Sequence, residues 1–292
     1  MVTTYIQLYT DARKALLEKE DPQDASFYAR QLIQQMSGMS QAKFLAHQQE
    51  YAPESVAAAV KTGVSRLLKG EPLAYVLGEW EFYGLKIHVT PDVLIPRDDT
   101  CAVAQLAIGQ ALFLPENPRI LDLCTGSGCI GIAVAKRVKD ARVTLADISS
   151  DALAVAKKNV IRHELTGRIA CVQANALAAP PDFLGEYDMI ISNPPYITTQ
   201  EMLELDPSVK DYEPHLALHG GSDGLDFYRS IAENYTKILK QDGYLCVEYD
   251  PSQVDAICYI LENHGYKVLE RVRDYKDRER ALLAQLVRKE EK

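Results

Sequence analysis

The sequence predicts an α/β fold in which a small helical domain precedes a parallel sheet with helices on its faces. Its 292 residues are long for one domain, so we expect two domains. Beyond Pro118, short apolar strands alternate with longer helical stretches, which is the pattern of a parallel α/β sheet. A glycine-rich turn separates the first of these strands from the helix that follows it.

Residues 1–75 have the pattern of a small helical domain. Asp24 is expected to cap a helix over residues 25–36, and Pro53 suits the first turn of a longer helix over residues 54–68. No group of catalytic side chains stands in this region. We therefore interpret it as a domain that recognises the substrate.

The range 76–95 is expected to be a β-hairpin linker. Residues 79–89 alternate bulky and polar side chains around Gly84, which is typical of two short strands joined by a tight turn. The stiff turn Ile95-Pro96-Arg97 follows. Because this stretch is dense in aromatic residues, we expect it to form a wall on the substrate side of the site, although a plain connector has the same pattern.

The third region, residues 96–292, is the larger predicted domain, and it opens with an apolar helix over residues 101–114. Seven strands are predicted after this helix, at residues 119–123, 142–147, 169–173, 187–192, 243–248, 267–273 and 281–286. Four helices are predicted between them, near residues 130–138, 150–163, 224–240 and 252–264. The carboxyl ends of parallel strands meet at one edge of a sheet, so the ligand crevice is expected there.

Gly126, Gly128 and Gly131 form a G-x-G-x-x-G pattern directly after the first of these strands. Glycines let the backbone turn tightly and approach a ligand closely. Asp147 ends the next strand, where a carboxylate can accept hydrogen bonds from both hydroxyls of a ribose. A nicotinamide dinucleotide and S-adenosylmethionine both fit this pattern. Asp122 favours the second, because a carboxylate there would repel a pyrophosphate but can position the loop or meet a cationic ligand.

Asn193-Pro194-Pro195-Tyr196 follows a buried apolar run. The two prolines fix φ and remove two backbone donors, so the turn is held in a narrow range of shapes. Asn193 offers an acceptor oxygen, Pro194 a bare carbonyl and Tyr196 a flat face for stacking. Together they can hold a planar amide-like nitrogen by accepting both of its hydrogens. A proline-stiffened turn without a ligand is the alternative.

Several stretches resemble known families. Residues 121–128 read Leu-Asp-Leu-x-Thr-Gly-Ser-Gly, which looks like motif I of class I S-adenosylmethionine-dependent methyltransferases, a Rossmann-like fold with a seven-stranded sheet. Asn-Pro-Pro-Tyr resembles the motif of methyltransferases that act on a planar nitrogen, either adenine N6 or a glutamine amide. The segments 70–84, 94–97 and 212–229 closely resemble the release-factor glutamine methyltransferases of the HemK/PrmC family.

This resemblance implies methyl transfer from S-adenosyl-L-methionine to the glutamine N5 in the Gly-Gly-Gln motif of peptide chain release factors, with S-adenosyl-L-homocysteine as product. The catalytic residues that it implies are Asn193, Pro194 and Tyr196, and Pro195 joins them in substrate binding. The cofactor-binding residues that it implies are Asp122, Thr125, Gly126, Ser127, Gly128, Cys129, Asp147, Ile148, Asn175, Ala176 and Asn193.

Three segments depart from the pattern of that family. It continues Pro-Arg with Pro-Glu-Thr, where this chain has Asp98-Asp99-Thr100. After Glu248 it has Ile-Gly and then Gln, where this chain has Tyr249-Asp250-Pro251-Ser252 before Gln253. Its late Asp-Leu-x-Gly-x-x-Arg is replaced by residues 274–280. Because of these departures, a catalytically silent S-adenosylmethionine-binding protein stays an alternative.

Composition bounds the function further. The net charge of −9 disfavours binding to phosphate backbones, so no direct nucleic-acid binding is expected and an adenine N6-methyltransferase is the less favoured enzyme. No apolar run approaches the roughly 18 residues of a spanning helix, and the N-terminus lacks the pattern of a signal peptide. The six cysteines form no Cys-x-x-Cys pair, which predicts reduced thiols and no metal site. We expect a cytoplasmic monomer that acts on release factors away from membranes.

Overall fold

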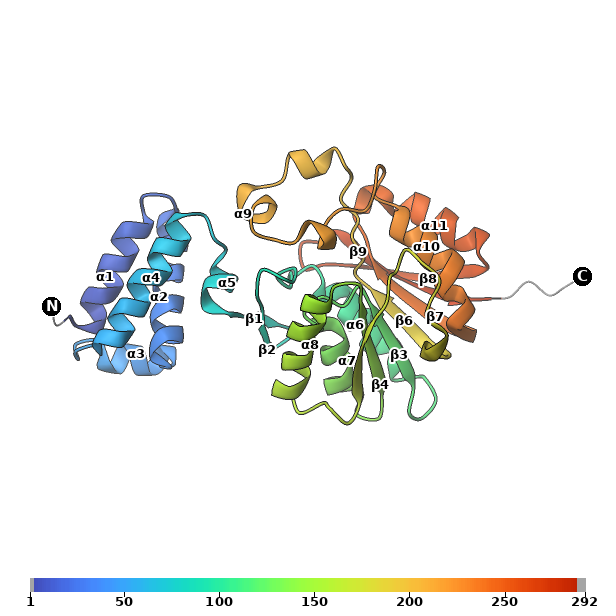
Figure 1. The fold of residues 1–292 in the computed structure, drawn as a ribbon, viewed down its shortest axis with the longest axis horizontal. Helices are drawn as coiled ribbons and strands as arrows, with labels where there is room; N and C mark the ends of the chain where they lie inside the picture. Colours follow the sequence, from blue (N-terminus) through green and yellow to red (C-terminus); the bar gives the residue numbers. More distant parts are fainter. Residues whose placement is uncertain (1–2, 288–292) are drawn as a thin grey trace, which may run out of the picture. The chain divides into compact units, whose positions relative to one another are not determined.

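The computed structural model describes residues 3–287 of the chain. These residues form two compact units, and most of their helices and strands are labelled in Figure 1. The first unit holds the N-terminal residues through Glu79 together with the short segment Pro207–Tyr212. The second unit holds Trp80–Asp206 and the residues from Glu213 onward. The first unit is therefore made of two separate stretches of chain.

The first unit is helical. Its helices are α1 (Tyr5–Leu16), α2 (Pro22–Ser37), α3 (Gln41–His47), α4 (Glu54–Leu68), α5 (Leu73–Leu77) and the single turn α9 (Pro207–Lys210). Helix α4 has the predicted bounds, with Pro53 just before it. Gly63 of α4 faces α2 closely, because a Cβ there would lie 2.6 Å from Leu32 Cδ2. The segment that contains α9 ends at Tyr212, whose hydroxyl donates to the carbonyl of Lys69 at 2.8 Å.

The cap of α2 differs from the prediction. Asp21, and not Asp24, is the N-cap, and its side chain accepts from the backbone N–H groups of Gln23 and Asp24. Pro22 occupies the first helical position, where its missing N–H costs nothing and its fixed φ suits a helix. The aspartate before this proline is therefore the residue that caps, and the helix begins one turn earlier than we predicted.

The second unit is built on a sheet of seven strands. The strands are β3 (Arg119–Leu123), β4 (Arg142–Asp147), β5 (Ile169–Gln173), β6 (Tyr187–Ser192), β7 (Leu239–Glu248), β8 (Tyr266–Arg273) and β9 (Glu279–Leu286). Their order across the sheet is β5-β4-β3-β6-β7-β9-β8. β9 runs antiparallel to both of its neighbours, and the other pairs are parallel. This confirms the predicted seven-stranded α/β fold.

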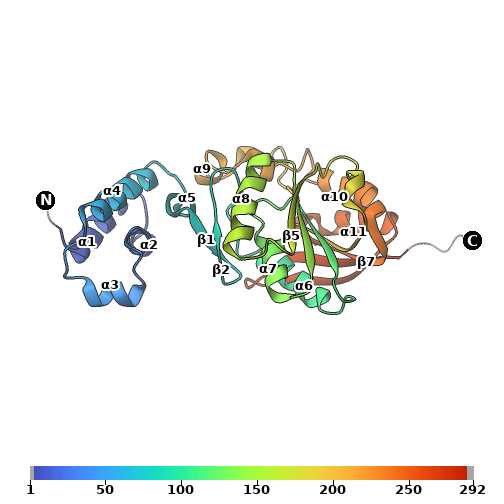
Figure 2. The same ribbon diagram turned by 60° about the horizontal axis from the view of Figure 1, so that its bottom comes forward.

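Helices cover both faces of this sheet (Figure 1 and Figure 2). The helices on one face are α6 (Cys101–Ala111), α7 (Cys129–Arg137) and α8 (Ser150–Arg162), and those on the other are α10 (Asp226–Asn234) and α11 (Val254–Asn263). The predicted helix over residues 224–240 is too long. A 3-10 turn over Tyr235–Ile238 ends it, and Leu239 already pairs with Tyr187 in the sheet. Burial of Leu239 in the core explains why the chain leaves the helix there.

The predicted hairpin is present as a separate two-stranded sheet, β1 (Glu79–Phe82) and β2 (Leu85–His88). Its turn residues Tyr83 and Gly84 have φ values of 52° and 74°, as a tight hairpin turn of type I′ requires. Asn159 of α8 joins this hairpin to the glycine loop. Its side chain is fully buried and bonds both backbone groups of His88 and the carbonyl of Ser127. None of the helices in residues 3–287 is both long and apolar enough to cross a membrane.

Candidate active site

The topology of the sheet brings the two predicted motifs together. β4 and β5 lie on one side of β3, whereas β6 and β7 lie on the other, so the strand order reverses between β3 and β6. Open α/β sheets bind ligands at the carboxyl ends of the strands at such a point. The ends of these two strands are in register, with Leu123 opposite Ser192. The glycine loop after β3 therefore stands beside the turn Asn193-Pro194-Pro195-Tyr196 after β6.

A cavity of about 190 Å³ opens at this edge. Its lining includes ten of the predicted site residues: Thr125, Gly126, Ser127, Cys129, Asp147, Ile148, Asn175, Ala176, Asn193 and Pro195. The predicted residues that do not line it are Asp122, Gly128, Pro194 and Tyr196. These four lie in the same two loops or at the end of β3, and each is within two positions in the sequence of a lining residue.

Asp122 lies beneath the glycine loop and braces it. Its Oδ2 accepts from the Thr125 hydroxyl at 2.7 Å and from the backbone N–H of Gly131 at 2.9 Å. Burial raises the pKa of this carboxyl to about 7, against the lowering effect of those two hydrogen bonds. Of the two roles that the sequence allowed for Asp122, these contacts support positioning of the loop.

Asp147 fixes the other side of the loop. One oxygen accepts from the Gly126 N–H at 2.8 Å and the other from the Ser149 N–H at 2.9 Å. Burial raises the pKa of Asp147, and these backbone donors lower it. The loop itself turns sharply, since Cys124, Gly126 and Gly128 all have positive φ. The carboxylate is therefore held rigidly at the cavity wall, with lone pairs left for a ligand.

The segment after β5 forms a further part of the cavity wall. Asn175 Oδ1 accepts from the Leu177 N–H at 2.9 Å, and the Asn175 carbonyl accepts from the Tyr235 hydroxyl at 3.1 Å. The carbonyl of Ala176 accepts from Ser230 at 2.7 Å. Contacts from α10 and the turn after it therefore hold this segment in place.

The Asn-Pro-Pro-Tyr turn is clamped by its neighbours. Asn193 Nδ2 donates to Thr100 Oγ1 at 3.2 Å, and Gln253 Nε2 donates to the Tyr196 carbonyl at 2.9 Å. Gly220 and Gly224 pack backbone to backbone against the same turn. A Cβ on Gly220 would lie 2.7 Å from the Pro195 carbonyl oxygen, and one on Gly224 would lie 2.2 Å from that of Tyr196. Glycine is thus required at both positions for this close approach.

The stretch after the hairpin forms another wall. Asp92, Val93, Leu94 and Pro96 line the cavity, while no residue of β1 or β2 in the described chain does. The stretch after the hairpin therefore contributes to the wall of the cavity, and the two strands of the hairpin do not. Residues 214, 216 and 217 also line the cavity.

An ion pair holds these two lining segments together. Arg97 pairs with the buried Glu213, whose second oxygen accepts from the Ile95 N–H at 3.2 Å. Burial raises the pKa of Glu213, and Arg97 lowers it. The pair therefore fixes the turn over residues 93–97 against the segment that begins at Glu213.

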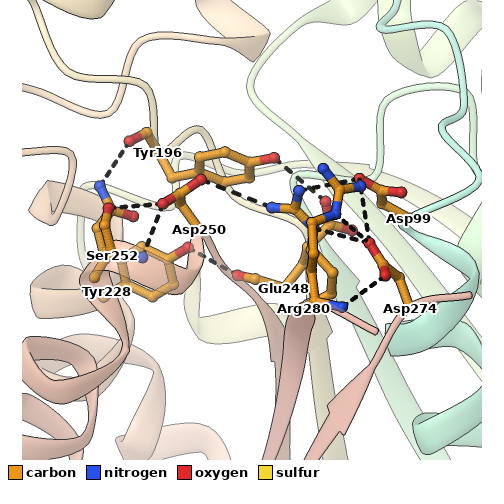
Figure 3. A network of polar contacts seen from close by, with 10 residues as sticks. Asp99, Tyr196, Tyr228, Glu248, Asp250, Ser252, Asp274 and Arg280 are labelled. Carbon is orange, nitrogen blue, oxygen red and sulfur yellow. Dashed lines mark hydrogen bonds and ion pairs between the residues drawn. The ribbon is translucent and has the colours of Figure 1, made fainter. Parts of the chain in front are cut away.

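A buried polar network lies behind the Asn-Pro-Pro-Tyr turn (Figure 3). Glu248, at the end of β7, is 2% exposed, and its Oε1 lies 3.5 Å from the Tyr196 hydroxyl. The Tyr228 hydroxyl donates to the Glu248 carbonyl at 2.8 Å. Sequence reasoning did not assign a role to Glu248, Thr100 or Gln253. The resemblance to the family could have pointed to these three residues, because each lies in a segment that was compared with the family pattern.

The charges of the cavity discriminate between the two cofactor classes. Among the described residues that line it, Asp92 and Asp147 are acidic and none is Lys, Arg or His. A pyrophosphate would find no cation there, whereas a cationic sulfonium would be stabilised. Within residues 3–287 no cluster of His, Cys, Asp and Glu side chains could hold a metal ion.

The strand order, with β9 alone reversed, and the placement of both loops at the switch point are those of a class I methyltransferase. The family described as Methyltransferase small domain matches residues 104–206, and the PrmC N-terminal domain family matches residues 7–78. The solved structure of a methyltransferase from Pyrococcus furiosus shares the fold, with a TM-score of 0.52 at 18% identity, over 77% of this chain and 98% of that chain.

Curated relatives define the family more closely. The release factor glutamine methyltransferase of Clostridium acetobutylicum is 39% identical over 216 residues, which cover 74% of this chain and 75% of the relative. That of Agrobacterium fabrum is 35% identical over 257 residues, which cover 87% and 88% of the two chains. The chain therefore belongs to the release factor glutamine methyltransferase family.

Proposed function

We propose that this chain transfers a methyl group from S-adenosyl-L-methionine to the side-chain N5 of the glutamine in the Gly-Gly-Gln motif of peptide chain release factors. Membership of the family supports the protein substrate. The observation that carries the chemistry is the orientation of Asn193: its nitrogen is bonded to Thr100, so its oxygen is left for a substrate amide. Release factors act in translation, and we expect the chain to meet them in the cytoplasm as a monomer.

The residues present fit S-adenosylmethionine. A Cβ added to Gly126 would meet no atom of the described residues within 4 Å, so the space beside this lining glycine is open to a ligand. Asp147 would accept from ribose hydroxyls, and Ile148 and Leu177 offer apolar surface for an adenine. When bound, the cofactor supplies an electrophilic methyl group on a cationic sulfur. The acidic lining favours that charge.

The proposed work of the Asn-Pro-Pro-Tyr turn is to orient a weak nucleophile. An amide nitrogen reacts poorly because its lone pair is delocalised into the carbonyl. Asn193 Oδ1 and the Pro194 carbonyl would accept its two N–H bonds, direct the nitrogen at the methyl group and stabilise the positive charge that develops. Tyr196 would pack against the flat amide, and Pro195 would keep the turn in shape. After transfer, one amide proton is lost to water and S-adenosyl-L-homocysteine is released.

One labelling experiment tests this function against its alternatives. The chain is incubated with S-adenosylmethionine carrying a tritiated methyl group and one of three acceptors: a purified release factor, the same factor with Gln→Ala in Gly-Gly-Gln, or double-stranded DNA. We expect label only in the unaltered release factor. Complete digestion of that product with proteases should yield labelled N5-methylglutamine, and acid hydrolysis should release the label as methylamine.

Each other outcome contradicts the proposal in its own way. Label in DNA alone would identify an adenine methyltransferase, against the charge argument. Equal label in both forms of the release factor would place the acceptor elsewhere in that protein. If no acceptor is labelled although S-adenosylmethionine binds, the chain is a catalytically silent binding protein.

A further inference from the structure

The Asn193 side chain can present two different groups to the cavity. Its amide carries an acceptor oxygen and a donor nitrogen of similar shape, and a half turn exchanges them. In the structure the nitrogen donates to Thr100 Oγ1 at 3.2 Å, and both residues line the cavity. The proposed reaction needs this orientation, because a substrate amide brings two donors. The groups that hold the Asn193 amide in this orientation are therefore part of the site.

Thr100 occupies the N-cap position of α6, but capping does not explain its side chain. A threonine at this position ordinarily accepts from a backbone N–H of the first helical turn. Within the described residues Thr100 makes no such bond, and it is only 2% exposed. Its oxygen instead accepts from Asn193 Nδ2. The Thr100 hydroxyl also lowers the pKa of the Glu248 carboxyl, whose buried Oε2 meets no hydrogen-bond donor of good geometry among the described residues.

The direction of these two hydrogen bonds follows from the number of protons available. A hydroxyl has one proton to donate, and an ionised carboxylate can only accept. The Thr100 oxygen accepts from Asn193, so its one proton is left to donate to an ionised Glu248. We propose that Thr100 and Glu248 are positioning residues that keep Asn193 Oδ1 toward the substrate nitrogen. This inference rests on the proposed function of Asn193.

The surroundings of Glu248 are suited to this role. Burial raises its pKa to about 7, while Thr100, the Arg280 guanidinium and Tyr196 lower it and Asp99 raises it. Besides these groups, the Tyr228 hydroxyl of α10 bonds the Glu248 backbone carbonyl. The carboxyl is therefore ionised above about pH 7 and can then accept the Thr100 proton.

Arg280 of β9 is the cation that faces Glu248, and three aspartates hold it in place (Figure 3). The Arg280 guanidinium lies 3.2 Å from Asp99, 3.4 Å from Asp274 and 3.7 Å from Asp250. Asp99 and Asp250 stand where the chain departs from the family pattern, whereas Asp274 and Arg280 keep the first and last residues of the family's Asp-Leu-x-Gly-x-x-Arg. Two of the departures therefore meet a cation that the family pattern retains, in one cluster behind Glu248.

The first test compares Thr100→Val with Thr100→Ser under single-turnover conditions. Valine keeps the shape but removes the hydroxyl, so the Asn193 amide is free to turn and the methyl-transfer rate should fall about tenfold or more. The dissociation constant of S-adenosylmethionine should change by less than about threefold. Serine restores the hydroxyl and should recover most of the lost rate. A rate for Thr100→Val equal to that of wild type would overturn the proposal.

The second test uses Glu248→Gln, which keeps the size of the side chain but can donate to Thr100. Its rate should fall to a similar extent, and adding Thr100→Val should cause little further loss, because both act through Asn193. The wild-type rate should fall as the pH drops below about 7, and this fall should vanish in Glu248→Gln. Fully multiplicative losses in the double variant would contradict a shared pathway.

A third measurement needs no substrate, so it separates this inference from the proposed function. In nitrogen-15 NMR spectra, the Asn193 side-chain amide is assigned by its absence in Asn193→Ala. Its hydrogens should exchange slowly in the wild type and faster in Thr100→Val and Glu248→Gln. Unchanged exchange in both variants would overturn the positioning role, even if the release factor is methylated. If methylation fails but exchange quickens as expected, the proposed function is at fault.

Discussion

Ser192, the last residue of β6, donates its hydroxyl to the carbonyl of Leu123, the last residue of β3, at 2.7 Å. Both residues are fully buried. The bond ties the two strand ends from which the glycine loop and the Asn-Pro-Pro-Tyr turn depart. Cofactor and substrate loops are therefore anchored to each other at their bases, and a shift of one would be transmitted to the other.

Replacement of Asn193 by alanine should abolish most of the activity. It removes one of the two acceptors proposed for the substrate N–H groups, so kcat should fall about 10²-fold or more. The affinity for S-adenosylmethionine, measured by calorimetry, should change little, because Asp147 and the glycine loop stay in place. A near-normal kcat would refute the role assigned to Asn193.

Gly131 should tolerate alanine poorly. A Cβ there would lie 2.3 Å from Leu145 Cδ2 and 2.9 Å from Asp122 Oδ2, so Gly131→Ala should lower the free energy of unfolding by about 1–3 kcal/mol. Gly109 of α6 is the matched control, because a Cβ there meets no atom of the described residues within 4 Å. Gly109→Ala should instead gain up to about 1 kcal/mol. Urea denaturation of both variants measures the difference.

Glu248 should make the protein less stable as the pH rises. Its pKa is raised from 4.5 to about 7 in the folded state, so the native protein binds this proton more tightly than the unfolded chain does. The protonated Glu248 carboxyl stabilises the folded state fully below about pH 4.5. This contribution to the free energy of unfolding is lost as the pH rises from there to about 7. Relative to wild type, Glu248→Gln should therefore gain stability across that window, by about 3 kcal/mol at most.

Denaturation of wild type and Glu248→Gln at several pH values checks this expectation. Asp122, which titrates in the same direction, contributes equally to both proteins and cancels in the difference. Glu233→Gln, at an exposed position of α10, is the control and should keep the wild-type profile. A difference between wild type and Glu248→Gln that stays constant with pH would show that burial does not raise the pKa of Glu248.

The pair of Arg97 and Glu213 gives a coupling experiment. Arg97→Met leaves the Glu213 carboxylate buried without its cation, and the free energy of unfolding should fall by about 2–3 kcal/mol. Glu213→Gln removes the charge, so Arg97→Met should cost much less in that background. Thermal unfolding of the two single variants and the double variant measures the coupling. Equal costs of Arg97→Met in both backgrounds would show that Arg97 and Glu213 do not pair in solution.

The local sequence pattern was enough to predict the strands whose ends carry the site. The strand β4 ends at Asp147 as predicted, and β6 ends at Ser192, directly before Asn193. These positions depend on hydrophobic runs and turn residues that are neighbours in the sequence. The predicted bounds of helices were wrong where a neighbouring residue or a strand competed for the same positions. Asp21 took the cap expected of Asp24 because of the proline beside it, and Leu239 left its predicted helix to pair in the sheet.

The contacts that support the site could not be predicted from the local sequence pattern. Asn193 and Thr100 are 93 residues apart in sequence, and Tyr196 and Glu248 are 52 apart. Only the folded sheet brings such pairs together. The effect of the departures from the family pattern could likewise be judged only from the structure. Asp277, at the glycine position of the family pattern, has a φ of 61°, so it keeps the left-handed backbone that the glycine would provide.

The discontinuity of the helical unit limits how the protein can be divided. Because Pro207–Tyr212 belongs to that unit, no single cut of the chain releases it whole. A fragment that ends near residue 79 would lack one of its own segments, and the remaining piece would carry that segment without its packing partners. Chimeras meant to change the protein substrate by exchanging the helical unit must therefore exchange residues 207–212 as well. A graft at one junction would join segments from two different proteins within one core.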